Sequence, residues 1–447
     1  MKKFLTLLMA LALLLPLCGG AAAEGYQDCH RVVLTKTDTT QDNGSIIRVW
    51  QADTVLDSVD EELASIQQDM VDRFGPELPA GKNKTSKSSR LDVELRYSRT
   101  GLTWLSFLIQ GRVSYYRELT DQAIVSRTYD MTTGKRVLLT DIFDDSSEGW
   151  DIMAKAVREQ ATAYFPGETP DEAVLDRYCT REGLQQLDFT LHGMSLVLHI
   201  PAQTLYPKHH TLIEVTLFYP DIRPYMTEKA QTETDNKAYY KMAALTFDDG
   251  PVRTNTTLVL NNMMEMGERA TFFVIGNRVE AYADQVQKEH DNGHAVASHN
   301  WNHGNVKKSK PSALRAMPEK VDDAFTGAIG IGVRYNRVPH GLYNQMIKAK
   351  VGWPLIQWSL DTYDWRGRSV GAIMSAVKDQ ISDGDIILCH DIKDNTPDAA
   401  RAICQYLQEQ GYMLVTIDEL FAKDGVTLQP DTVYYRCVDG KTDIKKR

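Results

Sequence analysis

The chain has 447 residues, of which 43% are hydrophobic and 25% are charged, and its formal charge at pH 7 is −10. This length predicts two or three domains, and the composition is that of a globular protein, which excludes a disordered or collagen-like chain. The negative charge argues against a nucleic-acid partner, because such binding depends on clustered cations.

Residues 1–23 have the pattern of a secretory signal peptide. Two lysines precede the apolar run 4–17, and three alanines ending at Ala23 supply a small-residue cleavage site. Because this run is short for a membrane span, we expect cleavage after Ala23 and a secreted, extracellular protein. Removal of the two lysines would take the formal charge from −10 to −12. Cys18 leaves an uncleaved or lipidated membrane anchor open as the alternative.

Five cysteines would remain in the exported protein, and none of them has the CxxC spacing of a zinc ribbon. An exported protein can form disulfides, so Cys29 with Cys179 and Cys404 with Cys437 are candidate pairs. Cys389 lies inside an apolar run and is expected to be a buried thiol.

Residues 24–226 are predicted to form a smaller α+β accessory domain. Strand-like alternation predominates, and two segments have helical spacing. The strands are expected at 32–37, 46–52, 91–97, 104–110, 113–119, 125–131, 189–191, 196–200 and 212–218, and the helices at 58–74 and 150–165. The polar segment 227–241 is expected to be a linker to the next domain.

From residue 242 to residue 447 the pattern changes to a regular alternation of strand, polar turn and helix. Strands are expected at 243–247, 270–275, 295–298, 335–338, 355–359, 386–388 and 413–415, and helices at 256–266, 279–291, 312–328, 343–350, 370–382 and 397–410. Such alternation predicts a parallel sheet with crossover helices, either open or closed into a barrel of about seven or eight strands.

Polar clusters follow five of these strands. They are Asp248-Asp249, His299-Asn300-Trp301-Asn302-His303, Arg337-Val338-Pro339-His340-Gly341, Asp361-Thr362-Tyr363-Asp364-Trp365 and His390-Asp391. Because the carboxyl ends of parallel strands share one edge of the sheet, and α/β enzymes place their catalytic groups there, we expect these clusters to meet in one site.

Two of the clusters together indicate a metal centre. The adjacent carboxylates of Asp248 and Asp249 repel each other, so burying both requires a cation or a proton. His299 and His303 are four residues apart, which places both imidazoles on one side of a turn. Two histidines and one carboxylate suit a catalytic divalent metal with an open position, and the second carboxylate is then free to act as a base.

In these five motifs, residues 242–447 resemble the polysaccharide deacetylase domain, also called the NodB homology domain, of carbohydrate esterase family 4. The resemblance implies a distorted (β/α) barrel of about seven or eight parallel strands and a hydrolase that removes acetyl groups from glycans. It also implies one divalent metal ion, with zinc as the first choice and cobalt or manganese as alternatives.

The same resemblance assigns roles to individual residues. The metal ligands would be Asp249, His299 and His303, and Asp248 would be the catalytic base, held by Arg337. The general acid would be His390, oriented by Asp364. The backbone of Pro339 and His340 would stabilise an oxyanion, and Trp365 and Leu388 would line the acetyl pocket.

The chain departs from the family pattern at two positions. Asn300 stands where the family usually has Ser or Thr, and we expect its side-chain amide to bridge the loop instead. His340 stands where the family commonly has Tyr, which leaves the backbone contact intact but alters the shape of the substrate site.

The N-terminal region has a resemblance of its own. The stretch Ser126–Lys135, which leads into Leu139–Phe143, is similar to the domain that precedes the catalytic domain of PdaC-type peptidoglycan deacetylases. Related domains form the extracellular part of RsiV-like anti-sigma factors. This similarity implies a wall- or ligand-binding role for residues 24–226.

Together these features predict a secreted, metal-dependent deacetylase that hydrolyses N-acetyl groups of cell-wall glycan, on N-acetylmuramic acid or N-acetylglucosamine of peptidoglycan. A chitooligosaccharide deacetylase and an acetylxylan esterase are alternatives that use the same residues. A different class of protein, a glycan- or lysozyme-binding sensor with an inactive barrel, would be expected to have lost part of the catalytic set, which is complete here.

Overall fold

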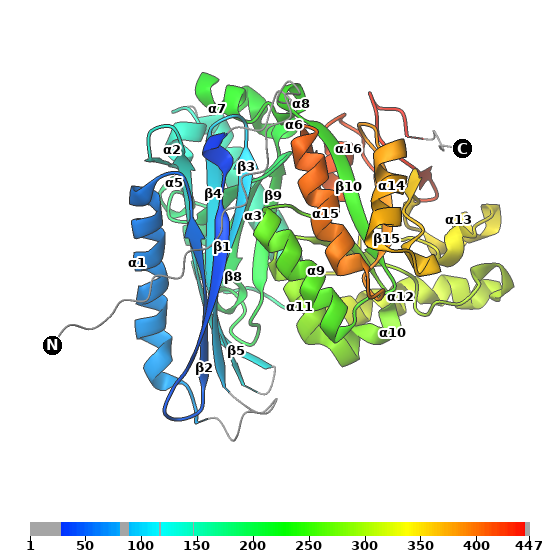
Figure 1. The fold of residues 1–447 in the computed structure, drawn as a ribbon, viewed down its shortest axis with the longest axis horizontal. Helices are drawn as coiled ribbons and strands as arrows, with labels where there is room; N and C mark the ends of the chain where they lie inside the picture. The colour runs from blue at the N-terminus through cyan, green and yellow to red at the C-terminus, as the bar shows by residue number, and fades with distance from the viewer. Residues whose placement is uncertain (1–27, 81–88, 116–117, 146, 443–447) are drawn as a thin grey trace.

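The computed structural model describes residues 28–80, 89–115, 118–145 and 147–442 (Figure 1). The expected signal peptide, 1–23, with Cys18, lies outside the described residues. Within the described ranges, no helix has the length and apolar character needed to cross a membrane.

The N-terminal unit is built on a six-stranded sheet of order β1-β2-β3-β4-β5-β6, antiparallel except for the parallel pair β2–β3. Its strands are β1 (Val33–Thr40), β2 (Ile46–Asp53), β3 (Arg90–Thr100), β4 (Trp104–Tyr115), β5 (Glu118–Asp130) and β6 (Lys135–Val137). The prediction of a separate strand at 113–119 was wrong, because β4 continues to Tyr115 and β5 begins at Glu118. Continuous pairing of β4 with β5 forms more backbone hydrogen bonds than short, separate strands would form.

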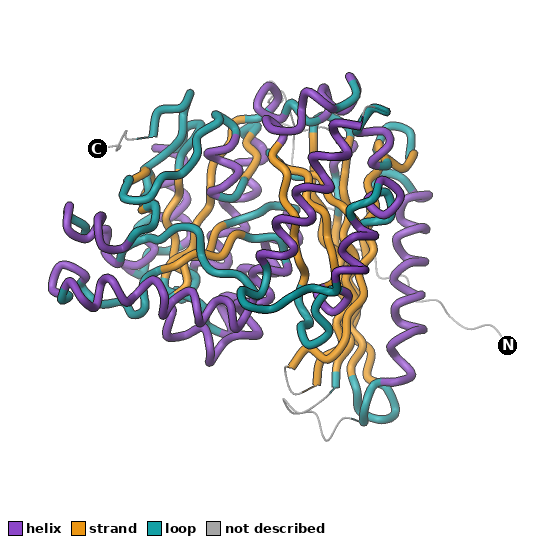
Figure 2. Tube along the Cα trace, turned by 180° about the vertical axis from the view of Figure 1, so that it is seen from behind, coloured by secondary structure: helices purple, strands orange, loops and turns teal. Residues whose placement is uncertain are grey.

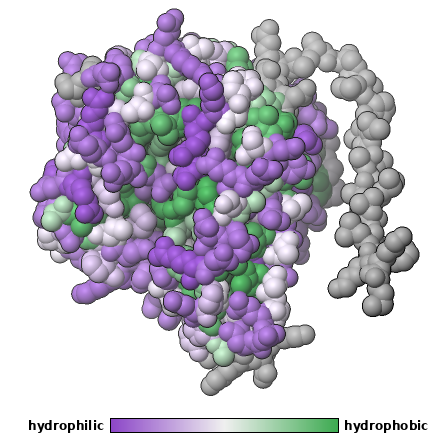
Figure 3. Space-filling view, turned by 90° about the vertical axis from the view of Figure 1, so that its left-hand side faces the viewer, coloured by the Kyte–Doolittle hydropathy of each residue, from purple (hydrophilic) through white to green (hydrophobic). Residues whose placement is uncertain are grey.

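Helix α1 (Asp57–Phe74) connects β2 to β3 and covers the outer face of the sheet (Figure 1). Val59, Leu63, Met70 and Phe74 recur with the helical period predicted from the sequence, and all four are buried against Leu91, Val93 and Ile109 of the sheet. On the outer surface of this unit, apolar side chains lie in patches between hydrophilic ones (Figure 3).

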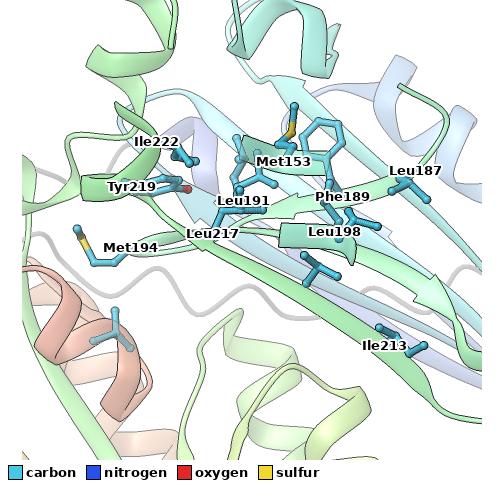
Figure 4. Close-up of a cluster of buried hydrophobic side chains, with 14 of the residues drawn as sticks. Met153, Leu187, Phe189, Leu191, Met194, Leu198, Ile213, Leu217, Tyr219 and Ile222 are labelled. Carbon is cyan, nitrogen blue, oxygen red and sulfur yellow. The ribbon is translucent and has the colours of Figure 1, made fainter. Parts of the chain in front are cut away.

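A second, three-stranded antiparallel sheet joins β7 (Asp188–Leu191), β8 (Ser195–Pro201) and β9 (Leu212–Phe218), as the sequence predicted. The surrounding helices are α2 (Leu139–Ile142), α3 (Ser147–Ala163), α4 (Glu172–Tyr178), α5 (Arg181–Leu184) and α6 (Tyr219–Ile222). Met153 of α3 points toward Phe189 and Leu191 of the sheet, within one buried apolar cluster (Figure 4).

The segment expected to be a linker is folded against the N-terminal unit. It contains α7 (Glu228–Glu233) and α8 (Asn236–Tyr239). The Glu233 carboxylate accepts hydrogen bonds from the backbone N–H groups of Leu102 and Thr103 at 3.1 Å. Gly101 has φ +62°, and a Cβ there would lie 2.2 Å from the Glu233 carbonyl oxygen, so only glycine allows this close approach. Segment 227–241 is therefore held in place by its polar side chains.

The C-terminal unit contains a parallel sheet of order β12-β11-β10-β15-β14, with β16 also paired to β10 and a separate pair β13–β17. The strands are β10 (Lys241–Asp248), β11 (Thr271–Val274), β12 (Ala295–Ser298), β13 (Leu355–Ile356), β14 (Leu360–Asp361), β15 (Ile386–His390), β16 (Tyr412–Leu414) and β17 (Val433–Tyr434). Its helices are α9 (Arg253–Met266), α10 (Gly276–Val279), α11 (Ala283–Asp291), α12 (Pro311–Ile329), α13 (Gln345–Val351), α14 (Val370–Gln380), α15 (Thr396–Glu409) and α16 (Ile417–Ala422).

The sheet does not close into a barrel among the described residues, which corrects the expectation of seven or eight strands in a closed ring. The strand expected at 335–338 is reduced to a single bridge residue, Asn336, between Ser298 and Leu355. The strand expected at 355–359 stops at Ile356, and β14 begins only four residues later. A parallel crossover needs a dozen or more residues, so β13 and β14 cannot pair side by side.

The two units share one apolar core. A single cluster of buried side chains includes Leu198 and Val215 of the N-terminal unit together with Met413, Val415 and Leu420 of the C-terminal unit. Figure 1 shows the long N-terminal strands beside α9 and α11, and Figure 2 shows the strands of the two units with helices between them.

None of the five described cysteines forms a disulfide, so both candidate pairs were wrong in this structure. The Sγ of Cys29 lies 3.4 Å from the carbonyl oxygen of Leu102, and the Sγ of Cys179 lies 3.5 Å from that of Ala154. Cys389 is fully buried in β15, as predicted.

Candidate active site and metal centre

The polar clusters meet at one edge of the C-terminal sheet, as the strand pattern predicted. Asp248 and His390 are the last residues of β10 and β15, and they are direct partners in the parallel ladder. His299 follows the last residue of β12, and Arg337 follows the bridge residue Asn336. Four separate chain segments therefore bring their side chains to the same place.

Asp249, His299 and His303 form a compact group of three metal-ligand types. The Asp249 Oδ1 lies 3.4 Å from the His299 Nε2 and 3.1 Å from the His303 Nε2. One ligand atom from each residue lies within 4.8 Å of the others. This two-histidine, one-carboxylate set leaves coordination positions open for other ligands.

The environment of the three residues fits a divalent cation. The His299 Nδ1 lies 2.8 Å from the carbonyl oxygen of Arg337; donating a proton there leaves Nε2 as the lone-pair atom facing Asp249. The Asp249 Oδ1 is buried and has no hydrogen-bond partner among the described groups. Burial raises the pKa of Asp249, but the nearby imidazoles of His299 and His303 outweigh it and lower that pKa to about 2. Burial lowers the pKa of His303, which favours its neutral, metal-binding form.

Asp248 is held by Arg337. The Arg337 Nη1 donates to the Asp248 Oδ1 at 2.7 Å and to the Thr246 Oγ1 at 2.8 Å. Its other nitrogens donate to the carbonyl oxygens of Ile356 and Gln357, at 3.2 Å and 3.0 Å. The guanidinium is completely buried, so Asp248 has one oxygen fixed and presents the other, Oδ2, toward His299 at 3.8 Å.

His390 forms a charge-assisted pair with Asp364. The His390 Nδ1 donates to the Asp364 Oδ1 at 2.8 Å, and the His390 backbone N–H donates to Oδ2 at 2.7 Å. Thr396 Oγ1 also donates to Oδ2 at 2.7 Å. Burial lowers the pKa of His390, but the hydrogen bond that it donates to Asp364 and the negative charge of Asp248 outweigh this effect, and the net pKa is raised. The ring is thus suited to carry a proton on Nε2.

Four residues of the site loops have backbone conformations in the left-handed region. Asp249 has φ +75°, Asn300 +63°, His340 +59° and Tyr363 +56°. This region is unfavourable for residues with a Cβ, and such strain concentrates where side chains must be aimed at a site. Each residue lies in a different one of the clusters that the sequence singled out.

The residues expected on the substrate side come from loops and a strand at the same edge. Pro339 is buried, and the exposed His340 ring meets His303 edge-to-face with 4.4 Å between centroids. Trp365 is 44% exposed, and its Nε1 lies 3.5 Å from the Asp361 Oδ2. Leu388 is buried in β15 opposite Asp361.

The expectation that the Asn300 amide bridges its loop was wrong. The Asn300 side chain is buried, but neither its Oδ1 nor its Nδ2 has a hydrogen-bond partner among the described residues. Its backbone N–H makes the loop contacts instead, donating to the Ser298 Oγ and to the Asn336 Oδ1.

Residue patterns in the sequence did not assign a role to several residues around the site. Thr246 and Thr396 orient Arg337 and Asp364, and only their positions next to the motifs could have indicated this role. Asp391 is fully buried, its Oδ2 accepts from Thr256, and its Oδ1 has no partner among the described groups. Burial, together with the charge of Asp249, raises the pKa of Asp391 to about 7.

Comparison with known proteins identifies a family and several relatives. A sequence profile described as polysaccharide deacetylase matches residues 235–352. The peptidoglycan-N-acetylglucosamine deacetylase PgdA of Listeria monocytogenes is 36% identical over 201 residues, which cover 45% of this chain and 42% of that protein. The peptidoglycan-N-acetylmuramic acid deacetylase PdaC of Bacillus subtilis is 34% identical over 181 residues, covering 40% and 38% of the two chains.

A shorter relative is matched over most of its length. A peptidoglycan-N-acetylglucosamine deacetylase of Bacillus cereus is 30% identical over 185 residues, which cover 40% of this chain and 67% of that protein. The chain therefore belongs to the polysaccharide deacetylase family. It spans 42% and 38% of the lengths of the Listeria and B. subtilis relatives.

Proposed function

We propose that this protein is a secreted, metal-dependent deacetylase that hydrolyses the N-acetyl groups of peptidoglycan. The observation that carries this proposal is the meeting of three pairs or groups at one sheet edge. They are the metal-ligand group Asp249–His299–His303, the Asp248–Arg337 pair and the His390–Asp364 pair. A bound divalent metal would polarise the acetyl carbonyl and acidify a water molecule; we propose zinc, with cobalt or manganese as alternatives.

The residues of the chain supply the proton transfers. Asp248, fixed through Oδ1 by Arg337, accepts a proton from the attacking water on Oδ2. The water oxygen bonds to the acetyl carbon, and the backbone N–H of His340, after Pro339, stabilises the oxyanion.

The carbon–nitrogen bond then breaks, and His390 donates the proton on Nε2 to the leaving nitrogen while Asp364 holds Nδ1. The products are acetate and a free amino sugar. Trp365 and Leu388 would enclose the acetyl methyl group. The glycan would be peptidoglycan, at N-acetylglucosamine or N-acetylmuramic acid, the substrates named for the relatives.

The proposed export rests on residues 1–23, which have the pattern of a signal peptide. The proposed wall association rests on the relatives that are named as peptidoglycan deacetylases. N-terminal sequencing of protein recovered from culture medium and from washed cells tests them. A start at Glu24 in the medium would support secretion, and an intact or lipidated N-terminus in the membrane fraction would favour an anchor.

Acetate release distinguishes the proposal from its alternatives. Purified residues 24–447 should release acetate from peptidoglycan, and this activity should disappear with a chelator and in Asp249→Ala. Release only from chitooligosaccharides or only from acetylxylan would change the substrate. No release from any of them by metal-loaded protein, together with glycan or lysozyme binding, would establish the sensor alternative.

A further inference from the structure

A groove separate from the catalytic residues lies between the two units. It encloses about 360 Å³ and is walled on one side by the inner face of β2, β3 and β4 and on the other by the first turns of α9 and α11. Arg48, Asp92 and Arg112 are direct neighbours across the three strands. Figure 1 shows α9 and α11 facing this sheet.

Two buried carboxylates in this groove have an oxygen without a hydrogen-bond partner among the described groups. Asp92 is 3% exposed; its Oδ2 accepts from the Arg90 Nε at 2.7 Å, but its Oδ1 has only the Arg48 Nη1 at 3.8 Å. Glu94 is 7% exposed; its Oε1 accepts from the Lys288 Nζ at 3.3 Å, and its Oε2 has no partner. Buried acceptors left without a donor destabilise a fold, so the groove is suited to a molecule that supplies donors.

The charges of the groove favour an uncharged ligand. Each of the four lining arginines already has a carboxylate partner, at 2.7 Å for Arg48–Asp38, Arg90–Asp92 and Arg253–Asp284 and at 2.9 Å for Arg112–Asp291. These ion pairs leave little net positive charge to attract a phosphate or a nucleic acid.

The uncharged groups of the groove match a sugar. Trp50 contributes an aromatic wall, and Asn261 contributes an amide with both donor and acceptor. Carboxylate acceptors, an amide and an aromatic surface together recognise hydroxyl and acetamide groups on an apolar ring.

The groove begins close to the catalytic edge. Its helical wall contains Arg253, Thr257 and Asn261, which are spaced by four residues and lie on one stripe of α9. Arg253 is the first residue of α9, five positions after Asp248, and its guanidinium lies over the ring of Tyr282 at 5.3 Å. From Arg253 to Asn261 the helix rises about 12 Å, so the groove leads away from the catalytic edge along α9.

We propose that this groove is a second saccharide site, which binds N-acetylated sugar units of the same strand that is being deacetylated at the catalytic edge. This inference rests on the proposed function for the identity of the strand. The site would make the affinity depend on the length of the oligosaccharide, because a short one can occupy the catalytic edge alone.

Asn261→Trp tests the site by filling the groove, and Leu258→Trp is the matched control, because Leu258 lies on the same helix and is 46% exposed. Titration calorimetry on chelated protein measures binding of N-acetylated chitohexaose without turnover. We expect Asn261→Trp, but not Leu258→Trp, to weaken hexamer binding by about tenfold or more. Glu94→Gln, which keeps the side-chain size, should weaken it as well.

A urea unfolding midpoint equal to that of wild type verifies that Asn261→Trp is folded. Hexamer binding equal to wild type in both Asn261→Trp and Glu94→Gln would overturn the second site. Absence of acetate release by the wild-type protein would instead overturn the proposed function, and the calorimetric comparison would remain valid.

Discussion

Replacement of Arg337 by methionine tests the role assigned to the buried pair. The substitution keeps an apolar stem of similar length but removes the cation that neutralises Asp248 and the donors to Ile356 and Gln357. Asp248 would then be a buried carboxylate without a charged partner. We expect Arg337→Met to lower the free energy of unfolding by about 3–5 kcal/mol, the usual result of removing one member of a buried ion pair.

The expected magnitude follows from the geometry of the pair. At 2.7 Å between Nη1 and Oδ1, the attraction is about 6 kcal/mol at an effective dielectric constant of about 20. Desolvation of two buried ions offsets much of this attraction. In a double-mutant cycle with Asp248→Asn, we therefore expect a coupling free energy of about 2–3 kcal/mol.

Urea unfolding of the two single variants and the double variant, all in chelator, measures this coupling without a contribution from metal binding. The double variant should be more stable than the sum of the single effects implies, because neither partner is left charged and alone. Additive effects would refute the assignment of Arg337 as the counter-ion of Asp248. Asp284→Asn with Arg253→Met, a partly exposed pair, provides a control with an expected coupling of about 1 kcal/mol or less.

Four further outcomes are expected. Asp364→Asn removes the carboxylate that raises the pKa of His390, so the alkaline limb of the kcat–pH profile should move to lower pH; an unmoved limb would exclude His390 as the acid. A metal ion at 100 times its Kd should raise the unfolding free energy by about 2.7 kcal/mol, and a thermal-shift series should show no such gain in Asp249→Ala. The pKa of Asp391 is raised to about 7, so its carboxyl is protonated in the folded state at pH values where it is ionised in the unfolded chain. In chelator, the free energy of unfolding should therefore fall by up to about 4 kcal/mol as the pH rises from about 4 to 7, and urea unfolding of Asp391→Asn should show no such fall. Deleting residues 24–226 should lower the melting temperature measured by calorimetry, and an equal temperature would contradict the shared core.

Periodicity and strand-end chemistry in the sequence were sufficient to predict the order of most elements and the meeting of the polar clusters at one sheet edge. Asp248 and His390 each end a buried strand, and the last residues of parallel strands lie at one common edge of the sheet. Their proximity could therefore be predicted from the strand pattern alone. The 3.6-residue period of Leu63, Met70 and Phe74 likewise fixed the buried face of α1.

Other features depend on contacts that local patterns do not record. The segment 335–338 has strand-like residues, yet only Asn336 finds backbone partners on both sides. The polar composition of 227–241 indicated a linker, whereas Glu233 and Asn236 use that polarity to bind the turn at Gly101. In both cases a distant part of the chain determined which local tendency was realised.

Helix α9 connects the N-terminal sheet to the proposed catalytic edge. The helix starts next to the Asp248–Asp249 turn and ends at Gly267, whose φ of +63° and close approach to the Tyr97 ring require glycine. The Tyr97 hydroxyl donates to the Glu265 carbonyl oxygen at 3.0 Å, and beside it the buried Arg99 pairs with Glu268 at 2.5 Å. The N-terminal sheet thus fixes the far end of the helix that follows the proposed metal ligand, Asp249.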